Sequence, residues 1–172
     1  MEGCETFNEL QIEDRANKII DQFDFWVEEI YPREINLSSV YDLEAQNYIT
    51  CFSHVKSKID IVYAENFDFS YEDLVSRLSK FTKEPIDFSS WLIDRNTHKK
   101  CSVSKAAYIL AKFYFNCHIQ DLHEKYGDIG TGYLGDKKTE NYIVNSLRSG
   151  EQNPIIRHSY FELEKLRDAI DY

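Results

Sequence analysis

Two histidines and a cysteine lie close together in the second half of the chain, and both side-chain types can bind metal ions. Cys117 and His118 are adjacent, and His123 follows five residues later. Side chains four residues apart stack on one face of a helix, whereas a spacing of five does not stack them. The spacing therefore favours ordinary helix positions over a metal site.

An acidic pair and a glycine-rich segment are the other chemically suggestive features. Glu13 and Asp14 lie in a polar stretch, which is typical of a solvated helix face. Residues 127–139 read GDIGTGYLGDKKT, with Tyr133 among the glycines. Closely spaced glycines indicate a backbone that bends sharply or lies close to another surface. The segment therefore predicts a loop that presents Tyr133.

One long helix is expected to position that loop. Apolar residues recur at helical spacing between Val103 and Leu122. Ser102 or Ser104 is the expected N-cap, and Gly127 stands where the helix should stop. The helix would give the Tyr133 loop a rigid support.

Strands and helices alternate in the rest of the predicted structure. The patterns predict strands over residues 23–27, 59–64 and 86–93, helices over 10–21, 36–55, 70–82, 139–147 and 160–170, and a polar connection over 94–101. The 59–64 strand is β-branched and aromatic, which favours a buried parallel strand. This alternation predicts an α/β fold with a short, mostly parallel sheet flanked by helices and a helical C-terminal part.

Two motifs in the second half of the chain identify a family. Residues 106–112 read AAYILAK, and residues 126–139 read YGDIGTGYLGDKKT. They resemble A-A-S-I-x-A-K and Y-G-D-F-G-S-G-Y-P-S-D-P-K-T of ribonuclease HII, especially its archaeal members. Weaker likeness extends from about Leu10 to Ser159, through EEIYPREI at 28–35, YDLEA at 41–45 and PIIRHS at 154–159.

This resemblance implies a ribonuclease H-like fold and a nuclease that cleaves RNA in RNA–DNA duplexes. It also implies four carboxylates that hold two Mg²⁺ or Mn²⁺ ions. Two such ions about 3.5–4 Å apart activate a water molecule and stabilise the leaving oxygen. The family's first two carboxylates are an Asp-Glu pair on its opening strand, before a Gly-Arg-Gly loop. We find no such strand, so the chain reads as if it began at the family's first helix.

The other two carboxylate positions carry altered residues. The third falls on Glu65 at the end of VYAE, where the family has Asp, and Asp60 and Asp68 are alternatives nearby. The longer Glu side chain can still bind Mg²⁺, and a solvated strand-end charge is the other interpretation. The fourth falls on His98. Imidazole suits Zn²⁺, Cu²⁺ or Fe, not Mg²⁺. Glu65 and His98 are thus degenerate catalytic positions, and Glu65 is the one candidate metal ligand.

The substrate-binding side of the family pattern is retained. By resemblance, Tyr133 would stack on the sugar at an RNA–DNA junction, with Gly132 beside it. Lys112, Lys137 and Arg157 would contact phosphates. The alternative is that these residues shape the loop and cap helices.

Composition sets the outer bounds on the protein. The 172 residues, with 42% hydrophobic and 15% aromatic side chains, fit one folded domain spanning 1–172. Within it, 1–9 form a tail without pattern, 10–100 the sheet and its helices, and 101–172 the helical part. Four widely spaced cysteines predict buried free thiols. No signal peptide or membrane span is recognised, so we expect a cytoplasmic protein without a membrane partner.

Charge and the missing strand guide the functional hypotheses. The net charge of −10 lowers the expected affinity for nucleic acid. An uncovered edge at the 59–64 strand would expose backbone groups, so we expect a protein partner, a homodimer or the 10–21 helix to cover it. The favoured hypothesis is a catalytically impaired binding or assembly module. The alternatives are an endonuclease completed by a partner that supplies the Asp-Glu strand, and a nucleic-acid-binding protein that does not cut.

Overall fold

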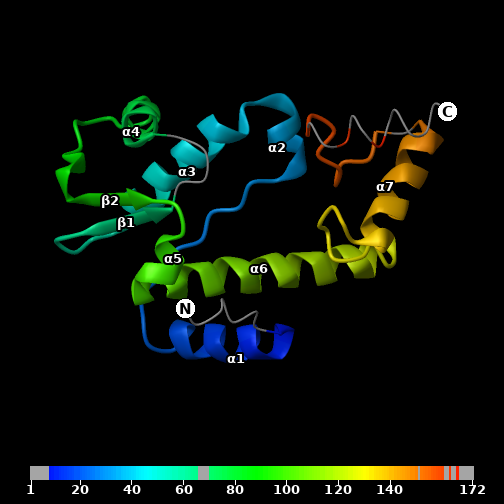
Figure 1. The fold of residues 1–172 in the computed structure, drawn as a ribbon, viewed down its shortest axis with the longest axis horizontal. Coiled ribbons are helices and arrows are strands. Elements are labelled where there is room, and N and C mark those ends of the chain that lie inside the picture. Colours follow the sequence, from blue (N-terminus) through cyan, green and yellow to red (C-terminus); the bar gives the residue numbers. More distant parts are fainter. Residues whose placement is uncertain (1–7, 66–69, 151, 161–162, 164–165, 167–172) are drawn as a thin grey trace. The chain divides into compact units, whose positions relative to one another are not determined.

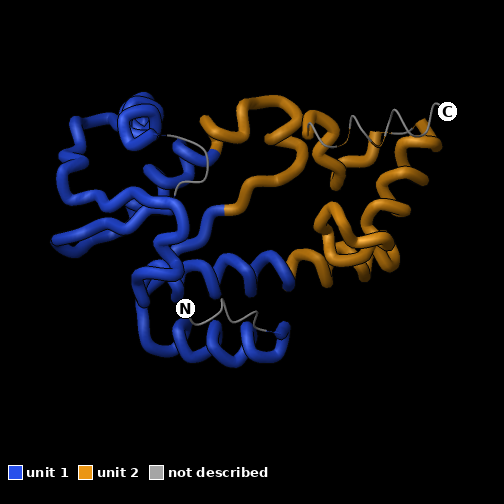
Figure 2. Tube along the Cα trace, viewed as in Figure 1, with its two compact units in different colours: residues 1–28, 44–116 blue, residues 29–43, 117–172 orange. Residues whose placement is uncertain are grey.

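The structure, a computed structural model, describes residues 8–65, 70–150, 152–160, 163 and 166 (Figure 1). The chain divides into two compact units, shown in different colours in Figure 2. Unit 1 comprises residues 1–28 and 44–116, and unit 2 comprises residues 29–43 and 117–172. Among the described helices, none is long and apolar enough to cross a membrane.

A parallel pair of strands lies in unit 1. Strand β1 (Val62–Glu65) pairs with β2 (Trp91–Asp94) in a register that sets Val62 opposite Trp91 and Glu65 opposite Asp94. Parallel strands end at the same edge of a sheet. The register therefore brings the acidic residues Glu65 and Asp94 to one edge.

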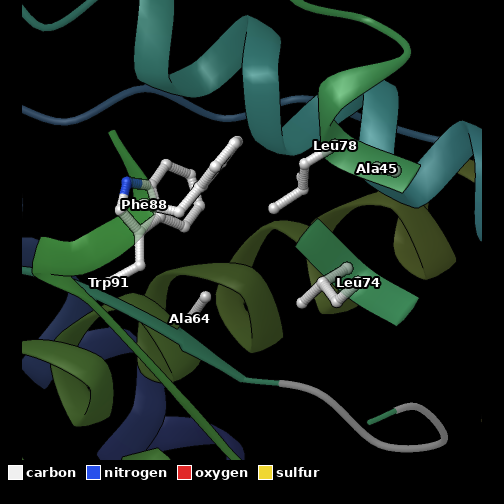
Figure 3. Packing of buried hydrophobic residues seen from close by; sticks show 6 residues of the cluster. All are labelled: Ala45, Ala64, Leu74, Leu78, Phe88 and Trp91. Carbon is white, nitrogen blue, oxygen red and sulfur yellow. The ribbon is translucent and has the colours of Figure 1, made fainter. Parts of the chain in front are cut away.

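Helices α3 (Val40–Ser53) and α4 (Tyr71–Ser79) contribute to the core beside this sheet. The buried cluster, drawn in Figure 3, consists of Ala45, Ala64, Leu74, Leu78, Phe88 and Trp91. Leu78 is completely buried, and the rings of Phe88 and Trp91 meet edge to face at 5.2 Å. Ser70 caps α4 by accepting a hydrogen bond from the Asp73 backbone N–H, which fixes where the helix begins.

A smaller core joins α1 (Glu9–Ile20) to the first half of α6 (Ser102–Tyr126) in unit 1. Ala16 packs against Ile109 and Leu110, and Figure 1 shows α1 running alongside α6. A capping box between Asn8 and Gln11 starts α1. The α6 residues that pack against α1, Ile109 and Leu110, thus belong to the apolar positions from which the helix is predicted.

Unit 2 contains α2 (Pro32–Leu37), α7 (Lys137–Ser149) and the end of α6. Pro32 occupies the first position of α2, where its missing N–H costs nothing. Asp136 caps α7, and Gly150 ends it with φ of +70°. Two loops, before and after α7, carry most of the unit's polar contacts.

Two of the three predicted strands are present but shorter than predicted, and the third is wrong. Residues 23–27 form no strand among the described residues, because no strand of the described sheet pairs with them. Their rings contact other segments instead: Phe25 faces Tyr114 and Trp26 stacks on His54. The 59–64 strand shrinks to β1 and is not fully buried, since Tyr63 remains 37% exposed. The 86–93 strand shrinks to β2 because the 3₁₀ turn η1 (Phe88–Ser90) precedes it. Residues 59–61 therefore have no partner in the ladder.

The helix predictions hold better than their caps. Four predicted helices are present: 10–21 as α1, 70–82 as α4, 101–126 as α6 and 139–147 as α7. The predicted 36–55 helix appears chiefly as α3. Neither Ser102 nor Ser104 caps α6, because the helix already begins at Ser102 and Cys101 precedes it. The polar connection 94–101 contains a short helix, α5 (Thr97–Lys100). Most of the predicted 160–170 helix lies outside the described residues.

Candidate functional site

Glu65 and His98, which the sequence predicts at two carboxylate positions of the family, meet in unit 1. His98 Nδ1 lies 2.7 Å from both Glu65 carboxylate oxygens, Oε1 and Oε2. The Asn96 backbone N–H donates a third hydrogen bond to Glu65 Oε1, at 3.2 Å. Both side chains are largely buried, with 15% of Glu65 and 16% of His98 exposed. The Glu65 carboxylate is therefore occupied by protein donors.

Local geometry explains this meeting. Glu65 ends β1, and the neighbouring strand β2 ends at Asp94. Asn96 then adopts the left-handed conformation, with φ of 64°, and turns the chain into α5, where His98 is the second residue. Asn tolerates this conformation better than most residues. The tight turn returns His98 to the end of β1.

Tyrosine side chains lie on either side of the pair. The Tyr108 ring on α6 stacks on the His98 ring, with centroids 4.8 Å apart and planes 17° from parallel. Tyr48 on α3 donates a hydrogen bond of 2.6 Å to the Glu65 backbone carbonyl. Burial raises the pKa of Tyr48, so it remains a hydroxyl donor. Glu65, His98 and Tyr108 form a contiguous set that we call the strand-end array.

The second acid at the sheet edge is also engaged. Lys100 hydrogen-bonds Asp94 and lowers the pKa of that carboxyl. Asp60, an alternative to Glu65, is an exposed residue near Lys58, with Nζ–Oδ1 of 3.9 Å. Asp68 lies outside the described residues. Among the described residues, no contact places Asp60 beside Glu65.

The glycine-rich loop of unit 2 is held by an acid and a hydroxyl. Asp136 Oδ2 accepts a hydrogen bond from the Thr131 backbone N–H at 2.7 Å and lies 3.0 Å from Thr139 Oγ1. The Gly132 N–H donates to Thr139 Oγ1 at 3.0 Å, and His123 Nε2 donates to the Gly130 carbonyl at 2.8 Å. Since Thr139 is buried, these contacts fix the loop from inside.

Two ionised carboxylates, Asp136 and Asp128, also stabilise this loop. The Thr131 N–H lowers the pKa of Asp136 to about 2, so its carboxylate is charged at neutral pH. A hydrogen bond from Lys138, 2.5 Å from Asp128 Oδ2, lowers the pKa of Asp128. Tyr133 is 50% exposed on this support. The sequence-based expectation of a presented tyrosine thus agrees with the loop's geometry.

The other predicted phosphate contacts lie in separate segments. Lys137 is the exposed first residue of α7. Arg157 is exposed on a loop tied to α2 by two bonds of Asn36, to the Ile156 carbonyl and from the Ser159 N–H. Lys112 belongs to unit 1, where its ammonium lies 5.1 Å from the Phe115 ring centroid. Their roles toward a ligand stay predictions.

No protein-family profile matches the chain, but its sequence is similar to that of several proteins of one kind. It is 29% identical over 162 residues to ribonuclease HII of Thermococcus onnurineus, covering 91% of the chain and 68% of the relative. It is 30% identical over 148 residues to ribonuclease HII of Methanospirillum hungatei, covering 78% of the chain and 67% of the relative. The chain belongs to the ribonuclease HII family. It spans about two thirds of the length of these relatives.

A solved structure agrees with this assignment at the level of fold. The chain superimposes with a TM-score of 0.80 and 22% identity on a chain of the PCNA–RNase HII complex from Archaeoglobus fulgidus, covering 95% of this chain and 78% of that one. The predicted ribonuclease H-like α/β fold and the kinship with ribonuclease HII are therefore confirmed.

The described residues do not fit the two-ion centre that the ribonuclease HII family implies. Across the described ranges, no group of three His, Cys, Asp or Glu side chains is arranged to hold a metal ion. At the strand-end array, donors surround the one carboxylate that could serve, and a hard cation needs oxygen acceptors in near-octahedral geometry. The hypothesis of a metal site at Cys117, His118 and His123 is likewise not supported. His118 packs against the Tyr31 ring, and His123 hydrogen-bonds the Gly130 carbonyl.

Three supporting residues were missed by sequence reasoning. Tyr108 stands where the family motif has Ser, a signal that the match itself contained. Asp136 and Thr139 are three residues apart at the start of a helix, which is the spacing of an N-cap and its partner. The hydrogen bond between Gly132 and Thr139, seven residues apart, depends on the shape of the turn and could not be predicted from the sequence.

Proposed function

We propose that this chain is a binding module of the ribonuclease HII family, which recognises RNA–DNA hybrids or DNA with an embedded ribonucleotide and does not cut them by itself. The observation that carries this proposal is the engagement of Glu65 by His98 and the Asn96 N–H. A carboxylate held this way is a poor ligand for Mg²⁺ or Mn²⁺. In such an assembly of catalytic groups, loss of one member abolishes most of the rate.

Recognition would rest on unit 2. The exposed Tyr133 ring stands on a loop that Thr139 and Asp136 hold in place. Stacking of a nucleobase on an aromatic ring is worth about 1–3 kcal/mol. Lys137 and Arg157 are exposed in the same unit and would add phosphate contacts. Binding would therefore survive without catalysis.

The test uses a duplex with one ribonucleotide in a DNA strand. Fluorescence anisotropy measures binding, and a denaturing gel measures cutting, in Mg²⁺, Mn²⁺ and EDTA. We expect binding without cutting in all three. Tyr133→Ala should weaken binding about 5- to 100-fold, while Tyr133→Phe, which keeps the ring, should bind like the wild type. Cutting by the wild-type chain that Glu65→Ala abolishes would contradict the proposal.

A second candidate is an endonuclease with two metal ions, formed when another polypeptide adds an Asp-Glu strand. The observation that favours it is the sheet: among the described residues, β1 pairs with β2 alone, which leaves its other edge available. The Archaeoglobus fulgidus neighbour was solved in complex with PCNA, so a PCNA protein is the partner to test first for an assembly role. Cutting that appears only when a partner is added would favour this candidate.

A further inference from the structure

Tyr108 is a large aromatic side chain that stays half exposed although it has a fixed support. Tyr108 is 48% exposed. One face lies on the His98 ring, 4.8 Å away between centroids. An aromatic ring that stacks on one neighbour and stays half exposed is the form of side chain on which nucleic-acid-binding proteins stack bases. The ligand that such a platform suits is planar and aromatic.

The support beneath Tyr108 is rigid. His98 Nδ1 is 2.7 Å from both oxygens of Glu65, and Glu65 is tied to the Asn96 N–H and, through its carbonyl, to Tyr48. Each member of the strand-end array therefore holds the next. A ring that is already ordered loses little entropy when a ligand stacks on it, so more of the stacking energy appears as affinity.

The chain segment that contains Tyr108 carries a net charge opposite in sign to that of the whole protein. Between residues 94 and 112 the chain carries five basic residues and one acidic residue, whereas the net charge of the full chain is −10. The acidic residue, Asp94, is paired with Lys100. Arg95, Lys99 and Lys105 are exposed in this segment. A local basic surface attracts phosphates even on an acidic protein.

We propose that the strand-end array is a stacking site for an unpaired base of a nucleic-acid strand, and that it needs no divalent ion. Tyr108 stacks on the base, and Arg95, Lys99 and Lys105 contact phosphates of the same strand. The site lies wholly within unit 1. It rests on and deepens the proposed function, because it names a second contact to nucleic acid in addition to the Tyr133 loop. The array thus holds a base where the family pattern places metal ligands.

Binding of a short fluorescein-labelled single strand, measured by anisotropy in EDTA at fixed ionic strength, tests the site. Tyr108→Ala should weaken binding about 5- to 100-fold, and Tyr108→Phe should restore it. Lys99→Gln and Lys105→Gln, surface changes that leave the fold intact, should each weaken binding and flatten its dependence on salt. Val103→Ala, an exposed residue of the same helix, is the matched control.

The outcomes separate this site from the proposed function. Wild-type affinity in Tyr108→Ala with unchanged salt dependence in the lysine variants would overturn the site, as would binding that requires Mg²⁺. If the single strand binds through Tyr108 but the ribonucleotide-containing duplex does not bind, the site stands and the proposed function fails. If the duplex binds through Tyr133 alone, the proposed function stands and the site fails.

Discussion

His98 is 33 residues from Glu65 in sequence, yet its Nδ1 lies 2.7 Å from both of that residue's carboxylate oxygens. The contact joins the end of β1 to α5 and, through Tyr108, to α6. This contact matters for metal binding in unit 1, because a Glu65 carboxylate that is hydrogen-bonded to His98 Nδ1 is not free to bind a metal ion.

Removing either partner should destabilise the protein. Glu65→Gln and His98→Ala each weaken or remove the hydrogen bonds between two largely buried side chains, so each should lower the free energy of unfolding by about 1–3 kcal/mol. Urea denaturation of both single variants and the double variant gives the coupling between them. Asp14 and Lys18 form the control pair, because their side chains are 63% and 67% exposed and should couple by only about 0.3–0.5 kcal/mol. Equal coupling in the two pairs would contradict a structural role for the Glu65–His98 contact.

Two glycines should respond differently to the same substitution. Gly127 and Gly130 have φ of +81° and +75°, so a side chain strains both. Gly127→Ala should cost about 1–2 kcal/mol from backbone strain alone. No steric clash adds to this cost, because nothing lies within 4 Å of the new Cβ. Gly130→Ala should cost clearly more, because its Cβ would lie 2.6 Å from Thr139 N and closer still to Asp136. Chemical denaturation compares the two, and equal losses would show that the loop is not packed as described.

Asp136 should give the protein a pH-dependent stabilisation. Its pKa of about 2 lies below the ordinary value of 3.8, because the Thr131 N–H and other donors favour the ionised form. The stabilisation is present above the ordinary pKa and is lost as pH falls from there through about 2. Asp136→Asn, which can still cap α7, should lower the melting temperature at neutral pH. The difference from wild type should shrink as the pH approaches about 2, and a difference that is constant with pH would contradict this role.

Two cysteines should differ in reactivity. The Ser104 backbone N–H lowers the pKa of Cys101, whereas burial raises the pKa of Cys51. The thiolate is the reactive form, so Cys101 should be alkylated by iodoacetamide faster than Cys51 near neutral pH. Peptide mass spectrometry measures both rates in one sample. In urea the rates should converge, and faster labelling of Cys51 in the folded protein would contradict the assignment.

Helices were easier to predict from this sequence than strands. The spacing of Leu74 and Leu78 after the capping Ser70 is local information, and α4 follows it. The alternation of Phe23, Phe25 and Val27 is equally local, but a strand also needs a partner, and the sequence does not say that Phe25 meets Tyr114. The extent of β1 is decided by the 3₁₀ turn before β2, on a distant segment.

The site could be located but not understood from sequence. Family motifs placed Glu65 and His98 at corresponding positions, and the structure brings them together. That they bind each other depends on the left-handed turn at Asn96, and that Tyr108 completes the array depends on the orientation of α6 within unit 1. Both are consequences of three-dimensional packing, which residue spacing along the chain does not contain.

A titration of the wild-type chain with Mn²⁺, followed by electron paramagnetic resonance, tests most directly whether Glu65 is engaged by protein donors instead of a metal centre. The free-ion signal should persist at one and two equivalents, as it should for Glu65→Gln, while His98→Asp, which exchanges the imidazole for a carboxylate, should reduce it. Two ions bound stoichiometrically by the wild-type chain, and lost in Glu65→Gln, would contradict the account.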